Sequence, residues 1–152
     1  MWCFKLTKKI DGHTTSNVRN QSLKDAGYDL KTVGRPAPSS IDDKMVKGID
    51  GLYENTNPNS NVKYVVDEAK FGGGRLGMTK DGKQMSDDWL TGKKSGDNRI
   101  LKAVNYDKKL ADKIEEALDE NELERVLSKV DSNGNVKTFR LNENGDKIGE
   151  WP

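Results

Sequence analysis

The sequence predicts an α+β fold in which a central mixed sheet is flanked by helices, and three observations support this class. Segments 45–53 and 62–71 are short, apolar and bounded by turn residues, as buried strands are. Segment 107–119 instead carries apolar residues at helical spacing. Near the end of the chain, segments 136–141 and 147–151 flank a turn and suit a β-hairpin. Because 152 residues suit a single core, we expect the whole chain to form one domain.

The first third of the chain is predicted to contribute an edge strand, a helix and a loop. Trp2, Phe4 and Leu6 alternate with other residues, which is typical of a short edge strand. A run of Thr and Ser then supplies N-cap oxygens for a helix over 17–26, and a glycine follows as its stop signal. Segment 34–43 is rich in proline and serine, so we expect a loop there.

Cysteine and histidine occur once each, and this limits the chemistry open to the chain. A single cysteine, Cys3, excludes an internal disulfide and a cysteine-based zinc site. The only histidine, His13, lies in an Asp-Gly-His turn without a recognisable orienting partner. We therefore interpret His13 as a surface polar residue rather than a general base.

The two apolar segments 45–53 and 62–71 are expected to pair as a hairpin across a long polar loop. On the second strand, the period of two places Glu68 and Lys70 on the same face. Asp67 would face the other side. The pattern leaves open whether Asp67 lies where the strand emerges or pairs with a basic residue.

A glycine-rich basic loop, 72–83, follows this strand. It lacks the Gly-Lys-Ser/Thr ending of a Walker loop, so we do not expect nucleotide binding and favour a mobile loop over a nucleic-acid backbone. The next segment, 83–91, has Met, Trp and Leu at helical spacing, which predicts a helix with Gln84 and Asp88 on a neighbouring face.

The last third is predicted to contain a pair of helices followed by the hairpin. Segment 99–104 is short and apolar and suits either a strand or a turn of helix. The helix over 107–119 is followed by a second one over 122–130, whose stripe would be buried in the core. The buried residues of that stripe would be Leu123, Val126, Leu127 and Val130.

Charge is unevenly distributed although the net charge is only +1. Residues 70–109 contain ten basic and five acidic residues, whereas residues 110–152 contain six basic and eleven acidic residues. A basic excess directly after the Glu-x-Lys strand suits a polyanionic substrate, although an ordinary solvated loop would have the same composition. No apolar run approaches the roughly 20 residues of a membrane-spanning helix, and the basic residues after a short apolar start are in the wrong order for a signal peptide.

An acid on one strand and Glu-x-Lys on the next can build a metal-dependent phosphodiesterase site. Asp50 and Glu68 supply carboxylates for a hard divalent cation, and the carbonyl of Ala69 is a further candidate ligand. Mg²⁺ is the expected metal, with Mn²⁺ and Zn²⁺ as alternatives. Lys70 would hold the attacking water and stabilise developing negative charge. A bare Glu-x-Lys is usually a surface ion pair, and only the apolar strand, the nearby acid and the basic loop favour a site here.

These residues resemble a known family. Three motifs look like those of the restriction-endonuclease-like PD-(D/E)XK nuclease superfamily. They are Gly-Ile-Asp-Gly around Asp50, Glu-Ala-Lys at 68–70, and Lys-Gln-Met-Ser at 83–86 with Trp89. More narrowly, they look like the C-terminal toxin domains of bacterial polymorphic toxins, including contact-dependent growth inhibition effectors. The resemblance covers about residues 46–90, and Ile49 replaces the proline that the superfamily places before the aspartate.

The resemblance implies a restriction-endonuclease-like core with Asp50 and Glu68 as metal ligands, Lys70 as catalytic residue and Gln84 near the active site. It implies a nuclease toxin that a larger protein delivers, that acts in the target-cell cytoplasm and that a cognate immunity protein neutralises. DNA is the favoured substrate and RNA, such as tRNA, the alternative; a non-catalytic binding module and a purely structural domain are the other classes kept open. The substrate would be held by residues of the basic loop and the following segment: Arg75, Lys80, Lys83 and Ser86.

Overall fold

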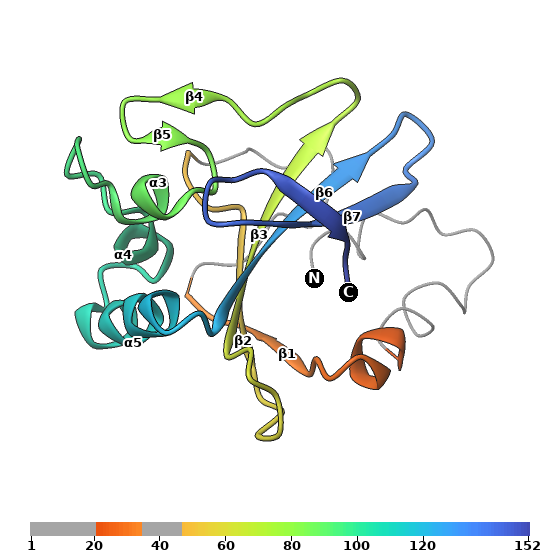
Figure 1. Ribbon diagram of the computed structural model, residues 1–152, viewed down its shortest axis with the longest axis horizontal. Coiled ribbons are helices and arrows are strands. Elements are labelled where there is room, and N and C mark those ends of the chain that lie inside the picture. The colour runs from red at the N-terminus through yellow and green to blue at the C-terminus, as the bar shows by residue number, and fades with distance from the viewer. Residues whose placement is uncertain (1–20, 35–46) are drawn as a thin grey trace.

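The computed structural model describes residues 21–34 and 47–152 and has an α+β fold with a six-stranded mixed sheet (Figure 1). The predicted strand at residues 2–6, Cys3 and His13 lie outside the described residues. So do the first residues of the predicted helix 17–26 and most of the predicted loop 34–43. No helix in the described part of the chain is long and apolar enough to cross a membrane.

The sheet has the strand order β1-β2-β3-β6-β7-β8. A separate two-stranded sheet, β4-β5, forms an arm beyond the end of β3 (Figure 1). The strands are β1 (Leu30–Thr32), β2 (Gly51–Asn55), β3 (Tyr64–Phe71), β4 (Met78–Thr79), β5 (Gly82–Lys83), β6 (Leu123–Val130), β7 (Val136–Leu141) and β8 (Lys147–Glu150). The labelled helices are α3 (Asp87–Thr91), α4 (Arg99–Ala103) and α5 (Lys108–Asp119).

The sheet is mixed because one connection crosses over. β1, β2 and β3 pair antiparallel in sequence order, and β6, β7 and β8 do the same. The arm and α3 to α5 lie between these halves, so that β6 returns parallel to β3, with Glu68 beside Leu127 and Lys70 beside Lys129. The predicted C-terminal hairpin is confirmed, and the predicted 62–71 strand is confirmed as β3.

The larger core lies between the sheet and α3 to α5, which stack along one side in Figure 1. The predicted helix 107–119 is confirmed as α5. Its N-cap Asp107 accepts a hydrogen bond from the Leu110 backbone N–H, and Ile114 is fully buried in this core. Segment 99–104, for which a strand and a helical turn were both open, is the short helix α4.

A smaller core covers the opposite face of the sheet. It is formed by Leu23, Tyr28, Tyr53, Val65, Val126 and Trp151. Within it the Glu124 carboxylate accepts hydrogen bonds from the Tyr28 hydroxyl and the Trp151 indole N–H, and pairs with Arg140 at 2.8 Å. Burial, together with the hydrogen bond to Glu124, raises the pKa of Tyr28 to about 12. Residues 21–25 are helical, as predicted, and Gly27 follows them at a φ of 93°.

The predicted second helix over 122–130 is wrong, because this segment is β6, a central strand of the sheet. Apolar side chains at 123, 126, 127 and 130 fit the stripe of a helix, but they equally fit a strand that is buried on both faces. Val126 packs in the smaller core and Leu127 in the larger one. Asn121, at a φ of 58°, turns the chain from α5 into the strand.

The boundaries of two other predicted elements are also wrong. The helix expected over 83–91 begins only at Asp87, after its N-cap Ser86, since Met85 is buried at a φ of 72° that no helix accommodates. The strand expected over 45–53 begins at Gly51, so Ile49 and Asp50 precede it. Part of the glycine-rich loop expected over 72–83 is the β4-β5 arm.

Asp81 anchors this arm to the loop after α3. The side chain of Asp81 is buried and accepts hydrogen bonds from the Lys94 N–H at 2.8 Å, the Ser95 N–H at 2.7 Å and the Ser95 hydroxyl at 2.5 Å. It also pairs with Arg99 at 2.9 Å, and the Arg99 guanidinium lies 4.6 Å from the centre of the Trp89 ring. The hydrogen bonds from Ser95, aided by Arg99, hold the pKa of Asp81 well below its ordinary value of 3.8.

We therefore expect Asp81 to make folding acid-sensitive. A carboxylate whose pKa is lower in the folded state stabilises that state above its unfolded pKa and loses this effect as the pH falls through its folded pKa. The urea midpoint of the wild type should drop more steeply between about pH 5 and pH 3 than that of Asp81→Asn. Equal slopes for the two proteins would show that Asp81 is not the coupled group.

Candidate active site

Asp50 lies where the chain enters β2, at the edge of the larger core. The turn before it contains Gly48 at a φ of 107°, a value that favours glycine. Asp50 is buried, and its Oδ2 accepts a hydrogen bond from the Ala69 backbone N–H at 2.9 Å. In a strand, the N–H and C=O of one residue point toward the same neighbour. The carbonyl of Ala69 therefore faces the Asp50 side as well.

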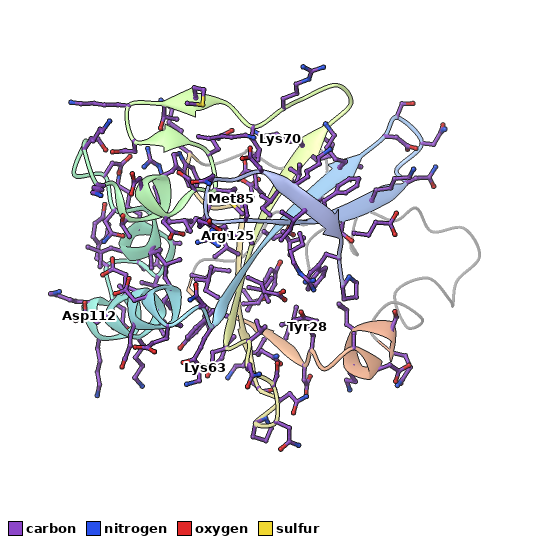
Figure 2. All side chains as sticks on the ribbon, viewed as in Figure 1. Tyr28, Lys63, Lys70, Met85, Asp112 and Arg125 are labelled. Atoms are coloured by element: carbon purple, nitrogen blue, oxygen red, sulfur yellow. The ribbon has the colours of Figure 1, made fainter. Side chains whose placement is uncertain are left out.

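Glu68 and Lys70 share one face of β3, as the alternation predicts. The Lys70 Nζ lies 3.2 Å from Glu68 Oε1. The side chain of Glu68 is 6% exposed and that of Lys70 is 21% exposed, so the carboxylate lies inside and the ammonium group lies at the opening. Figure 2 shows Lys70 at the end of β3 nearest the arm. The structure thus brings together Asp50, from the turn before β2, and Glu68 and Lys70, from β3.

The electrostatics of Glu68 are those of a carboxylate that lacks a full counterion. Burial first, and the negative charge of Asp50 second, raise the pKa of Glu68 to about 8, while Lys70 lowers it only in part. Glu68 Oε2 is buried and accepts no hydrogen bond from an N–H group of the described residues, and the Asp50 carboxyl is the acid that faces Glu68. Two buried carboxylates form a donor set that fits a hard divalent cation. No group of three or more His, Cys, Asp or Glu residues in the described segments could hold a metal, so backbone oxygen or water would complete the coordination.

Comparisons of the chain with protein-family models, with curated proteins and with solved structures find no match. The site is therefore interpreted from its own geometry.

Asp67 is part of the opposite face. It is almost fully buried, and its Oδ1 accepts a hydrogen bond from the Ser128 hydroxyl at 2.7 Å. Ser128 lies on β6, next to Val126 of the smaller core. The sequence left two interpretations of Asp67 open. The one in which Asp67 lies where the strand emerges from the core is wrong, because Asp67 lies inside the sheet and forms a hydrogen bond with a neighbouring strand.

A groove of about 530 Å³ is lined by two of the predicted substrate-binding residues, Arg75 and Lys83. Glu68 and Lys70 do not line it themselves, but their neighbours on β6 do. Its floor includes Leu127 and Lys129, which are the neighbours of Glu68 and Lys70 across the β3-β6 pair. Lys147 on β8 also lines it. Lys129 and Lys147 were missed by sequence reasoning, and the only signal that would have found Lys129 is recognition of segment 122–130 as a strand.

The other predicted residues have positions that differ from those expected. Gln84 lies in the turn before α3, where its Oε1 accepts a hydrogen bond from the Gly77 N–H at 2.8 Å, so the prediction that it sits on the helix is wrong. The Ser86 hydroxyl is the N-cap of α3 and accepts from the Trp89 N–H at 3.3 Å. Lys80 is exposed in the turn of the arm and does not line the groove.

Proposed function

We propose that this protein is a metal-dependent nuclease that hydrolyses phosphodiester bonds at the cluster of Asp50, Glu68 and Lys70. One observation carries the proposal: a buried acid, Glu68, faces a second acid, Asp50, and a lysine, and burial together with Asp50 raises its pKa to about 8. Such a group costs folding free energy unless a cation or substrate uses it. A cluster of perturbed groups is a reason to infer a functional site.

Each residue has a distinct role in this proposal. Asp50 and Glu68 hold a divalent cation, for which Mg²⁺ is the first candidate and Mn²⁺ or Zn²⁺ the alternatives. When bound, the cation supplies charge neutralisation and a more acidic water. Lys70, at the open side of the cluster, binds a phosphate oxygen or the attacking water and stabilises negative charge as it develops. The Ala69 N–H orients the Asp50 carboxylate.

The nuclease superfamily, the toxin role and the substrate are proposed from the sequence resemblance. A mixed sheet with helices against it is compatible with a restriction-endonuclease-like core, and Glu-Ala-Lys lies near the end of β3, where that superfamily's motif places it. On this proposal the chain is an antibacterial toxin domain. A larger protein delivers it, it acts in the target-cell cytoplasm, and a cognate immunity protein blocks it. DNA is the favoured substrate, and RNA such as tRNA is the alternative.

A gel of plasmid DNA and total RNA tests the proposal. With Mg²⁺ the purified protein should shorten one of the two substrates, and EDTA should abolish this, because the carboxylate pair alone cannot activate water. The same gel decides between DNA and RNA. Shortening that continues unchanged in EDTA would contradict the metal-dependent site.

A non-catalytic nucleic-acid-binding module is the second candidate, and the groove lined by Arg75, Lys83, Lys129 and Lys147 favours it. Such a module would retard nucleic acid in a native gel with or without EDTA and would leave its length unchanged in Mg²⁺, Mn²⁺ and Zn²⁺.

A further inference from the structure

We infer that the groove beside the carboxylate pair binds the phosphate backbone of the nucleic acid, with Lys129 and Lys147 as contacts, and that this binding needs no metal. The inference rests on the proposed function for the identity of the ligand and adds to it the path of the substrate. It extends the substrate-binding side from the basic loop to the C-terminal strands of the sheet.

The first argument is continuity with the carboxylate cluster. Leu127 and Lys129 on the floor of the groove are register partners of Glu68 and Lys70, and neighbouring strands lie about 4.8 Å apart. Gly74, at the rim of the groove, lies against the stem of Lys70: a Cβ added to Gly74 would be 3.6 Å from the Cβ of Lys70. A chain lying in the groove therefore passes Lys70, where a scissile phosphate would meet Glu68.

The second argument is charge. Eight residues line the groove; four of them are cations, and none is acidic. Lys83 is compensated by Asp146 at 2.7 Å, but Lys129 donates to the backbone carbonyl of Gly74, and the Lys147 Nζ lies 4.3 Å from the centre of the Phe139 ring. Arg75 is exposed and forms no ion pair within the described segments.

These partners hold Lys129 and Lys147 in place without cancelling their charge. A carbonyl uses one of the three donors of an ammonium group, and an aromatic ring attracts a cation while remaining neutral. Two fixed, uncompensated cations in the same groove as an exposed arginine suit a ligand with regularly repeated negative charge. A nucleic-acid backbone has this property, and its binding depends on the number of phosphates that are neutralised.

The third argument is the rigidity of the far wall. The turn between β7 and β8 packs directly on the segment before α3, since a Cβ on Gly145 would lie 2.6 Å from the Gln84 carbonyl oxygen. The Asp87 N–H also donates to the Glu143 carbonyl at 3.0 Å, and Asp87 pairs with the buried Arg125 of β6. The wall that carries Lys147 is thus fixed to the helical layer.

Fluorescence anisotropy in EDTA tests the inference without cleavage. The probes are labelled 20-nucleotide duplex DNA, single-stranded DNA and RNA of one sequence, titrated with the full chain at several NaCl concentrations. Lys129→Gln, Lys147→Gln and Arg75→Gln should each weaken binding and reduce the slope of log affinity against log salt by about 0.7 to 0.9. Lys113→Gln, at an exposed position on α5, makes the same charge change outside the groove and should leave the slope unchanged.

Thermal melting shows whether each variant is folded. Lys147→Gln is the decisive variant, because this exposed side chain donates no hydrogen bond to the backbone among the described contacts, so its replacement should not disturb the fold. The inference fails if folded groove variants bind as the wild type does, or if Lys113→Gln weakens binding equally. It also fails if polyglutamate displaces the oligonucleotide at equal charge concentration, since the groove would then suit an acidic protein.

Groove-dependent binding without cleavage in any metal would overturn the proposed function alone. Metal-dependent cleavage with unaltered binding by the groove variants would overturn this inference alone.

Discussion

Replacing Glu68 by Gln is expected to remove nuclease activity while the fold keeps or gains stability. The substitution conserves shape but removes a metal-binding charge, so cleavage should fall by about 10²–10³-fold or more. The folded protein should not suffer, because the Glu68 carboxyl, with its pKa raised to about 8, is already mostly neutral at pH 7 in the absence of metal, and an amide can also donate a hydrogen bond to Asp50. The measurements are the cleavage rate with Mg²⁺ and the melting temperature of the same preparation.

Lys70→Ala should lose activity to a similar extent, because the only cation paired with Glu68 among the described residues is removed from the open side of the cluster. Glu54→Gln on β2 and Lys63→Ala just before β3 are matched controls, since they make the same charge changes in the same hairpin but away from the site. Wild-type cleavage by Glu68→Gln or Lys70→Ala, with the controls also active, would show that the site is elsewhere.

The second large effect is expected at Ile114, which fixes α5 to the sheet. Ile114 is 0% exposed and belongs to the larger core. Truncation to alanine removes buried methyl groups and leaves a cavity, which costs about 2–5 kcal/mol of unfolding free energy. Urea denaturation monitored by tryptophan fluorescence measures this change, since Trp89 lies in the same core.

Lys113→Ala is the control for Ile114→Ala, because it alters the neighbouring exposed position of the same helix. A surface change of this kind should alter stability by no more than about 0.5 kcal/mol. Equal stability of Ile114→Ala and Lys113→Ala would mean that α5 is not packed as described.

The spacing of apolar and charged residues along the sequence predicted the features that depend on the geometry of a single helix or strand. The period of two along 62–71 was sufficient to place Glu68 and Lys70 on one face, and the spacing over 107–119 was sufficient for α5. The acid at Asp50 could be paired with Glu68 because β2 and β3 are neighbours in the chain and in the sheet. The mixed α+β class followed from these elements.

The remaining features depend on contacts between distant segments. The apolar positions of 122–130 fit two periods equally well, and only pairing with β3 and β7 on both sides decides for a strand. The positions of Lys129 and Lys147 in the groove follow from that pairing and could not be predicted without it. Gln84 was misplaced because the backbone of Met85, at a positive φ, interrupts what reads as a helical repeat.

The parallel pairing of β3 with β6 also determines when the proposed site can form during synthesis of the chain. Asp50, Glu68 and Lys70 leave the ribosome well before β6, since the arm and three helices are translated in between. Until β6 arrives, one edge of β3 is unpaired and the floor of the groove does not exist. Closing such a long crossover is the slow part of forming a parallel pair. The site therefore acquires its burial and its groove only as the last third of the protein is completed.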